Sequence, residues 1–151
     1  FPFYLDSKDG YITSKFTSKV SLGIADYPMC RLAEAYLIEA ECLLKGSQPD
    51  VVKGLQILNA LRVKRGESQL TSAQFTSDEI WKERRRELYG EGFALSDIKR
   101  LQKPLERVGE EHWSDVITLP ANSPRMMFPI PADELDYNKS ATSDDQNEYW
   151  R

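Results

Sequence analysis

The sequence contains few of the residues on which several kinds of functional site depend. Of its 151 residues, two are cysteine and one is histidine. Two cysteines are too few for a disulfide-rich scaffold or a cysteine-rich zinc module. A single histidine, His112, excludes any site that needs two. We therefore expect neither a metal site nor a bound cofactor.

An excess of positive charge and long apolar runs are also absent. Twenty Lys and Arg residues against 24 Asp and Glu residues give a net charge of −4. Such a chain lacks the basic surface that nucleic-acid binding requires, so we expect no nucleic-acid partner. No stretch approaches the roughly 20 apolar residues of a membrane helix. A hydrophobic content of 40% is typical of a globular protein, and the length predicts one domain over residues 1–151.

The start of the chain lacks the pattern of a signal peptide, which is a basic segment followed by an apolar stretch. The first residue is Phe1 rather than Met. We therefore expect a processed form or a piece of a longer protein.

Turn and helix signals divide the chain into four segments. Asp9-Gly10 is a turn signal and predicts a short hairpin or an extended lead-in. Repeated prolines break regular structure near the C-terminus, where we expect an extended polar tail from Ser140 to Asn147. The predicted segments are a lead-in over 1–27, a helical hairpin over 28–66, a helix pair over 76–102 and a loop-rich, Pro-rich closing segment over 103–151.

The helical hairpin is predicted from two apolar patterns of helical spacing. The first helix should begin at Pro28 and end near Gly46, a natural C-terminal cap. The second should run from about Pro49 to Gly66, and the short connection predicts antiparallel packing. Gly54 is either a weak point of this helix or a site of close packing. The predicted apolar stripe of the first helix comprises Met29, Leu32, Ala33, Tyr36, Leu37, Ala40, Leu43 and Leu44.

The third predicted helix begins at the capping sequence Thr76–Glu79, ends near Tyr89, and carries a concentration of negative charge. Glu83, Glu87 and Glu91 recur every four residues and so lie on one face. Like charges at this spacing are unfavourable in water, and burial raises the cost greatly unless each carboxylate is paired. A fourth helix is expected to follow and to end before Pro104.

Arginines of the neighbouring helices are the expected partners, because guanidinium groups suit buried bidentate pairs. One alternative is a solvated charged face. Another is that Glu83 and Glu87 form a catalytic carboxylate pair, which is disfavoured because nearby arginines would keep the carboxylates ionised and occupied. The predicted structural ion network comprises Arg31, Glu34, Arg62, Arg65, Glu83, Arg84, Glu87, Glu91, Asp97 and Arg100.

Five motifs follow one another between residues 27 and 149. They are Tyr27–Glu41, Asn59–Arg62 with Arg65, Glu83–Gly92 with Asp97–Arg100, Phe128–Pro131 with Glu134 and Asn138, and Gln146–Tyr149. In order and spacing these motifs resemble those of SusD/RagB-like proteins. The end of the chain departs from the pattern, because Glu148 stands where proline is usual and the following glycine is missing.

The resemblance implies a mainly α-helical fold with tetratricopeptide-like helical hairpins, of which this chain looks like the C-terminal part. It implies a non-catalytic lipoprotein that binds glycans or other nutrients on the outer surface of the outer membrane of Bacteroidetes. The lipid anchor would precede Phe1, and the partner would be a SusC-like TonB-dependent transporter. The alternatives are a protein–protein docking module whose ligand site lies outside this chain, and a carboxylate-dependent glycoside hydrolase.

Ligand-binding residues cannot be transferred from the resemblance, because in this family they vary with the substrate. Aromatic rings flanked by polar groups are the usual sugar-binding surfaces. Trp113, which adjoins His112 in a loop, and Tyr11, which adjoins a turn, are therefore the candidate ligand-binding residues. Burial of Trp113 under the loops is the alternative, and His112 is expected to be a loop hydrogen-bonding residue. Tyr36 and Trp81 are expected to lie in the core.

Overall fold

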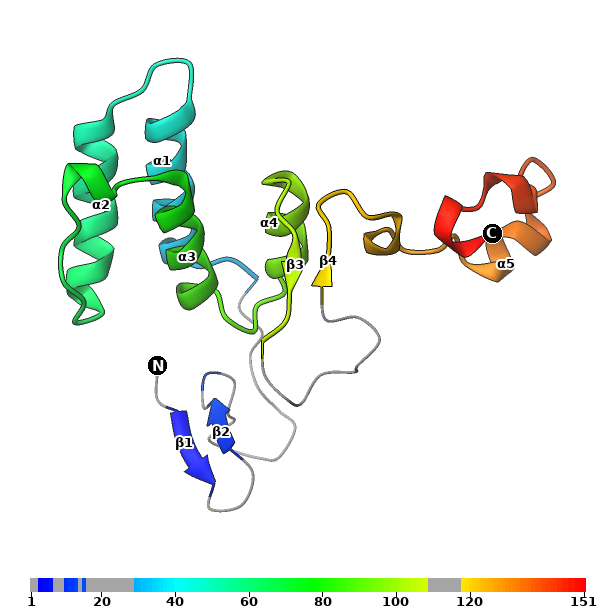
Figure 1. The fold of residues 1–151 in the computed structure, drawn as a ribbon, viewed down its shortest axis with the longest axis horizontal. Coiled ribbons are helices and arrows are strands. Elements are labelled where there is room, and N and C mark those ends of the chain that lie inside the picture. The colour runs from blue at the N-terminus through cyan, green and yellow to red at the C-terminus, as the bar shows by residue number, and fades with distance from the viewer. Residues whose placement is uncertain (1–2, 7–9, 14, 16–28, 109–117) are drawn as a thin grey trace. The chain divides into compact units, whose positions relative to one another are not determined.

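The computed structural model describes residues 3–6, 10–13, 15, 29–108 and 118–151, and these are mainly α-helical, as predicted (Figure 1). The chain forms two compact units, Phe1–Glu87 and Leu88–Arg151, and each is described by itself. The boundary falls within the predicted helix pair over 76–102, and the prediction of one domain over the whole chain stays a prediction. No helix among the described residues is both long and apolar enough to span a membrane.

The first unit begins with a β-hairpin. Strand β1 (Phe3–Asp6) pairs with strand β2 (Gly10–Thr13) in antiparallel register, with Phe3 opposite Thr13 and Asp6 opposite Gly10. The hairpin predicted in the lead-in is thereby confirmed.

Helices α1 (Leu32–Lys45) and α2 (Val51–Lys64) form the predicted helical hairpin. Helix α1 begins four residues later than the prediction, because the backbone of Arg31 is extended rather than helical. It ends as predicted at Gly46, whose N–H donates to the carbonyl of Cys42 over 2.7 Å. The carboxylate of Asp50 caps α2 by accepting the N–H of Lys53 over 3.0 Å.

Helix α3 (Ser77–Glu87) packs against α1 and completes the three-helix core (Figure 1). Its first turn is capped as predicted, since Thr76 Oγ1 accepts the N–H of Glu79 over 3.2 Å. The largest fully buried side chains come one from each helix, and they are Leu37, Leu58 and Ile80.

Gly54 is a site of close packing, as one of the two predictions for it stated. A Cβ atom at this position would lie 2.9 Å from Cζ of the buried Phe75 and 3.2 Å from Cβ of Leu43. The absence of a side chain therefore lets α2 approach α1 and the Phe75 ring. A short 3-10 turn, Ser72–Gln74, positions that ring at the end of the loop.

The predicted apolar stripe of α1 is too wide. Ala33, Leu37 and Ala40 are buried, but Leu32 is 67% exposed and Tyr36 is 40% exposed. The prediction that Tyr36 lies in the core is therefore wrong, because α2 and α3 cover only one narrow face of α1. Trp81, the other aromatic residue assigned to the core, is partly buried.

The second unit begins with two glycines in the left-handed region, Gly90 (φ 75°) and Gly92 (φ 85°). Helix α4 (Ala94–Arg100) follows. Strand β3 (Leu105–Glu106) then pairs antiparallel with strand β4 (Thr118–Leu119).

The rest of the closing segment consists of short turns around helix α5 (Ala132–Tyr137). Three 3-10 turns are formed, Pro124–Met126, Ser143–Asp145 and Glu148–Trp150. The extended tail predicted from Ser140 to Asn147 is therefore wrong in part. A capping box between Thr142 and Asp145 folds it into a turn, in which Asp145 Oδ2 accepts the N–H of Thr142 over 2.7 Å.

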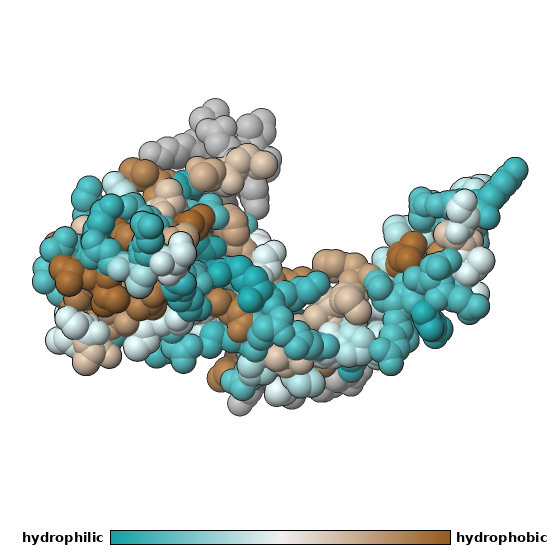
Figure 2. Space-filling model, turned by 90° about the horizontal axis from the view of Figure 1, so that it is seen from above, coloured by the Kyte–Doolittle hydropathy of each residue, from teal (hydrophilic) through white to brown (hydrophobic). Residues whose placement is uncertain are grey.

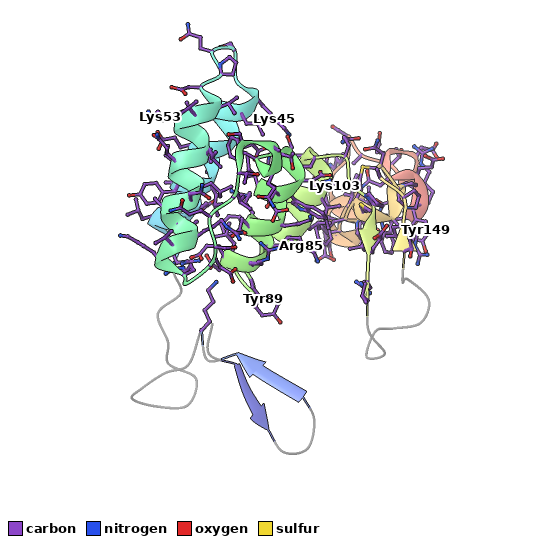
Figure 3. All side chains as sticks on the ribbon, turned by 60° about the vertical axis from the view of Figure 1, so that its left-hand side comes forward. Lys45, Lys53, Arg85, Tyr89, Lys103 and Tyr149 are labelled. Atoms are coloured by element: carbon purple, nitrogen blue, oxygen red, sulfur yellow. The ribbon has the colours of Figure 1, made fainter. Side chains whose placement is uncertain are left out.

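Charged and apolar side chains are mixed on the surface of both units (Figure 2). Lys45 and Lys53 lie near the turn of the helical hairpin (Figure 3). Lys45 pairs with Glu41 over 3.6 Å, and Lys53 pairs with Glu39 over 3.3 Å. Exposed pairs of this kind contribute little to stability.

Candidate functional site

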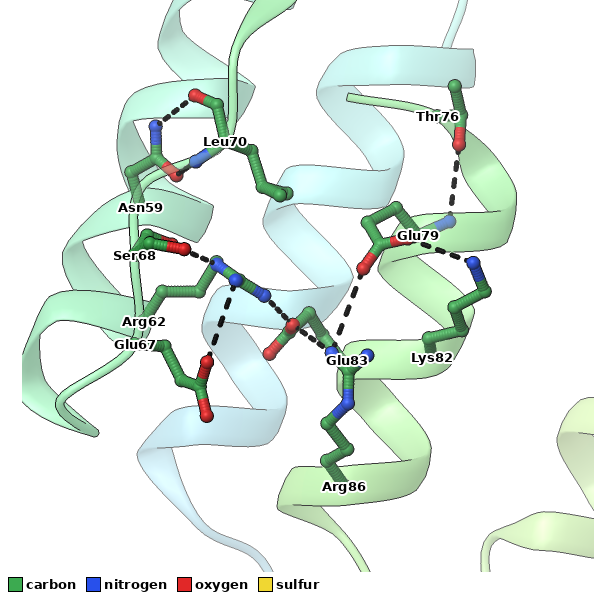
Figure 4. Close-up of polar contacts among 10 residues, drawn as sticks. All are labelled: Asn59, Arg62, Glu67, Ser68, Leu70, Thr76, Glu79, Lys82, Glu83 and Arg86. Carbon is green, nitrogen blue, oxygen red and sulfur yellow. Dashed lines mark hydrogen bonds and ion pairs between the residues drawn. The ribbon is translucent and has the colours of Figure 1, made fainter. Parts of the chain in front are cut away.

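Arg62 of α2 is the centre of a buried cluster of charged side chains (Figure 4). Its Nη1 pairs with Glu83 of α3, and its Nε donates to the carbonyl of Ser68 over 2.7 Å. The side chains of Arg62 and Glu83 are only 7% and 8% exposed. Arg86 and Glu67 flank the pair, Arg86 on Glu83 and Glu67 at 3.8 Å from Arg62 Nη2. One side chain thus connects α2, the following loop and α3.

Glu87 at the end of α3 is the centre of a second cluster. Arg65 binds its carboxylate in a bidentate manner, with Nε 2.8 Å from Oε2 and Nη2 2.7 Å from Oε1. Arg31 Nη1 lies 2.9 Å from Oε1. The main-chain carbonyl of Glu87 accepts two further bonds, from Arg31 Nη2 over 2.6 Å and from Lys15 Nζ over 3.0 Å. Because this carbonyl ends a helix, it has no partner within α3.

The environment of Glu87 favours its ionised form. Burial by itself raises the pKa of the Glu87 carboxyl. The hydrogen bonds from Arg65 and Arg31 lower it by more than burial raises it, so that the pKa lies below its usual value. The hydrogen bond between Arg65 and Glu87 also raises the pKa of the Arg65 guanidinium. A glycosidase acid needs a carboxyl group of raised pKa that reaches the sugar. The geometry does not support the Glu83–Glu87 pair in this role, since arginines occupy both carboxylates inside the unit.

The other members of the predicted network are distributed over both units. Asp97 is buried in the second unit and accepts a hydrogen bond from Arg100 Nε over 2.9 Å. Arg84 and Glu91 are also buried. Glu34 is half-buried and forms no ion pair with the residues that the structure describes. Successive helical residues point about 100° apart, so Glu34 is turned away from the face that its neighbour Ala33 buries.

A cavity of about 510 Å³ lies in the second unit, within the closing segment and the residues near it. Three aromatic side chains, those of Phe128, Tyr149 and Trp150, line it together with leucine, methionine, proline and arginine residues. This volume and this lining are typical of small-molecule sites. The Phe128 side chain is 76% exposed, so its ring is accessible to a ligand.

Specific contacts hold the aromatic rings of the cavity. Trp150 Nε1 donates to the carbonyl of Met127 over 2.8 Å. The ring of Tyr149, which is labelled in Figure 3, meets the ring of Trp150 edge-on, with a centroid distance of 5.0 Å and an angle of 86°. The guanidinium group of Arg125 also contacts the Tyr149 ring, and its Cζ lies 4.8 Å from the ring centroid.

The C-terminal tail is fixed to the segment that carries Phe128. The amide of Gln146 accepts the N–H of Ile130 over 2.8 Å and donates to its carbonyl over 3.0 Å. The amide of Asn147 donates to the carbonyl of Phe128. The buried Gln146 therefore acts like a partner strand, and it brings Phe128 and Trp150 to the same cavity.

The two ligand-binding residues predicted from the sequence are not part of this cavity. Trp113 and its neighbour His112 lie outside the described residues. Tyr11 lies in β2, of which only the backbone is described. Both assignments stay predictions.

Sequence reasoning missed the aromatic residues that line the cavity. A signal was present, because Phe128 begins the fourth motif, Tyr149 ends the fifth, and Trp150 follows Tyr149 directly. These motifs were interpreted as structural, and the aromatic residues at their ends were therefore not assigned to a binding site.

Comparison with protein families gives a match over almost the entire chain. The model of the SusD family matches residues 6–150. The chain belongs to the SusD family. The resemblance inferred from the five motifs is thereby confirmed, and the matched range includes both charged clusters and the cavity.

Solved structures of SusD proteins support the assignment. A SusD superfamily protein from Bacteroides vulgatus is 32% identical over 85% of this chain, with a TM-score of 0.71. One from Bacteroides thetaiotaomicron is also 32% identical, over 82% of the chain, with the same TM-score. A SusD-like carbohydrate-binding protein from B. vulgatus is 28% identical over 78% of the chain, with a TM-score of 0.62.

The chain spans 28–30% of the length of these SusD structures. A comparison with curated proteins gave no match. The activity and partners of a complete SusD protein are therefore a matter of proposal for this chain.

In this SusD chain, polar residues of the motifs connect elements. Asn59 of the second motif accepts the N–H of Leu70 over 2.7 Å and donates to its carbonyl over 3.0 Å (Figure 4). Gln146 of the fifth motif makes the equivalent pair of bonds with Ile130. These polar motif residues thus hold the fold, and three other motif residues, Phe128, Pro129 and Tyr149, line the cavity.

Proposed function

We propose that this SusD chain is part of a non-catalytic protein that binds carbohydrate. The aromatic cavity of the second unit carries the proposal, because exposed rings pack well against the C–H faces of sugars. One of the similar solved structures is described as a carbohydrate-binding protein, which agrees with this assignment.

The absence of catalysis is part of the proposal. The acidic pair that could have cleaved a glycosidic bond, Glu83 and Glu87, is buried and bound by arginines. The lowered pKa of Glu87 opposes the protonated state that a general acid requires. A bound sugar should therefore leave the protein unchanged.

Membership of the SusD family supports proposals for the location and partner of the complete protein. We place it on the outer surface of the outer membrane of Bacteroidetes, held by an N-terminal lipid anchor. Its partner would be a SusC-like TonB-dependent transporter, which would take up the oligosaccharide that the SusD protein captures.

A glycan panel tests the binding function. The chain is applied to immobilised oligosaccharides of plant, animal and microbial origin, and the bound sugars are then analysed by mass spectrometry. We expect binding to a restricted set of sugars and recovery of each sugar intact. Cleavage products, or no binding to any sugar, would contradict the proposal.

A second candidate function, protein–protein docking, is favoured by apolar side chains on the surface of the helical hairpin. Leu32 and Val52 are 67% and 68% exposed, and Ile38 and Val63 are about half exposed. Exposed apolar groups of this kind mark interaction sites when they are contiguous. The same glycan panel discriminates the two functions, since a docking module whose ligand site lies elsewhere would bind no sugar.

A further inference from the structure

The charge of the cavity differs from that of the chain as a whole. Arg107 and Arg125 both line it, and none of the described residues that line it is an aspartate or a glutamate. The complete chain, in contrast, has a net charge of −4. A locally positive, partly apolar cavity in an acidic protein complements a negatively charged ligand.

The hydrogen-bonding capacity of the lining points in the same direction. Apart from the arginines and the polar tips of Tyr149 and Trp150, the described side chains of the lining are apolar. Guanidinium groups and the indole N–H donate hydrogen bonds but cannot accept them, and the indole N–H of Trp150 is already bonded to Met127. The Tyr149 hydroxyl is the one oxygen acceptor among the described side chains of the lining. A neutral sugar presents several hydroxyl groups that need acceptors, so this lining suits a ligand that is itself rich in acceptors.

We propose that the cavity binds an acidic oligosaccharide, one whose sugar rings carry a carboxylate or a sulfate. This inference rests on the proposed carbohydrate-binding function and adds the class of sugar. One ring face would pack on Phe128 or Trp150, and the anionic group would accept hydrogen bonds from Arg107 and Arg125. Arginine suits this role because its planar fork binds two oxygens of the same anion.

Arg125 is held in place before a ligand arrives. Its guanidinium group lies over the Tyr149 ring, and Tyr149 in turn contacts Trp150. Stacking of this kind restricts the arginine side chain and reduces the entropy that binding would otherwise cost. The charged group and the aromatic surface are therefore parts of one arrangement.

The experiment compares sugars that differ in charge and share a ring. Calorimetric titrations of the full chain use trigalacturonate, its fully methyl-esterified form, and a sulfated galactose oligosaccharide. We expect at least one of the two anionic sugars to bind tenfold or more tightly than the neutral ester. The arm that binds identifies carboxylate or sulfate as the preferred anion.

Two variants and a matched control assign this preference to the cavity. Arg107→Gln is expected to lower the affinity for the anionic sugar about tenfold and the affinity for the ester by much less, so that the preference for the anion falls. Arg125→Lys keeps the charge but loses the planar fork, so we expect a smaller loss. Lys139→Gln removes the same charge from an exposed position of the unit that does not line the cavity, and it should have no effect.

The outcomes separate the two proposals. Equal affinity for the acid, the sulfate and the ester, or an unchanged preference in Arg107→Gln, would overturn the acidic-sugar inference while sugar binding itself stood. If the chain bound none of the three sugars but bound neutral glycans of the panel, only this inference would fail. If it bound no sugar at all, both proposals would fail.

Discussion

At the scale of single residues, the interior of the first unit contains two carboxylates that are paired with arginine side chains. Glu83 and Glu87 lie one helical turn apart and are both buried, and each receives at least two arginine side chains. A buried ion pair adds little stability relative to apolar packing, but removal of one partner is costly because a buried charge is left behind. These residues therefore specify how the helices meet.

The Arg62→Ala variant tests this pairing. The substitution leaves the Glu83 carboxylate buried without its main partner, and it also removes the bond to the Ser68 carbonyl. We expect the free energy of unfolding to fall by about 3–5 kcal/mol, measured by denaturant unfolding. The control is Lys64→Ala, an exposed position on the same helix. A loss below about 0.5 kcal/mol, the range of ordinary surface changes, would mean that Arg62 is not needed inside the unit.

The lowered pKa of Glu87 predicts that the stability of the fold depends on pH. Its pKa is below the usual 4.5 in the folded chain, so folding favours the ionised form. The resulting stability is fully present above pH 4.5 and is lost as the pH falls through the folded-state pKa. Glu87→Gln should cost about 1–3 kcal/mol at neutral pH, and the difference from the wild type should shrink below pH 4.5.

Unfolding curves recorded at a series of pH values measure this difference. Glu106→Gln, which removes a solvent-exposed carboxylate from the second unit, is the control and should follow the wild type. A gap between Glu87→Gln and the wild type that stayed constant into acid would contradict the assignment.

Part of this arrangement was predictable from residue spacing. Carboxylates repeated every four residues on a face with Ile80 require partners, and arginine is the suitable one. Glu34 shows the limit, because a sequence motif does not reveal which way one helical residue is turned. The aromatic cavity was not predictable in this way, since it depends on the hydrogen bonds between the Gln146 amide and Ile130, which lies 16 residues earlier in the sequence.

At the scale of elements, the sequence predicted the helices more accurately than the loops. Helices α1 and α2 end near the predicted glycines, Gly46 and Gly66, because glycine favours helix termination. Helix α2 begins near the predicted Pro49, where Asp50 provides the cap. The start of α1 was predicted too early, because Arg31 adopts an extended backbone. The closing segment was predicted only as loop-rich. Its turns are stabilised by the capping box of Thr142 and Asp145 and by side-chain amides whose partners are set by the fold.

The Gln146→Ala variant tests the connection of the tail. Its side chain makes both hydrogen bonds of a strand pair with Ile130. Each such bond contributes about 1 kcal/mol, so we expect the amide of Ile130 to exchange its hydrogen roughly tenfold faster or more. Hydrogen exchange followed by NMR gives this rate directly.

A control in the same segment distinguishes a local effect from general loosening. Asn138→Ala removes a side-chain bond to Glu134 in α5 and should leave the exchange of Ile130 unchanged. If Gln146→Ala also left it unchanged, the amide of Gln146 would not be what holds the tail.

At the scale of the whole molecule, the chain combines a unit organised by internal ion pairs with a unit that carries an accessible cavity. Membership of the SusD family accounts for the helical fold and the order of the motifs. The chain spans under a third of the similar SusD structures, so its role within a complete protein rests on the proposals made above. Of these, carbohydrate binding by the aromatic cavity is the most consequential.

One titration tests that claim most directly. The sugar that binds most strongly in the glycan panel is titrated into the wild-type chain, Phe128→Ala and Tyr137→Ala. Phe128 and Tyr137 are aromatic residues of the same unit that are 76% and 83% exposed, but only Phe128 lines the cavity. We predict at least a tenfold loss of affinity, about 1.4 kcal/mol, for Phe128→Ala and none for Tyr137→Ala. Equal affinity of both variants and the wild type would contradict the assignment of sugar binding to this cavity.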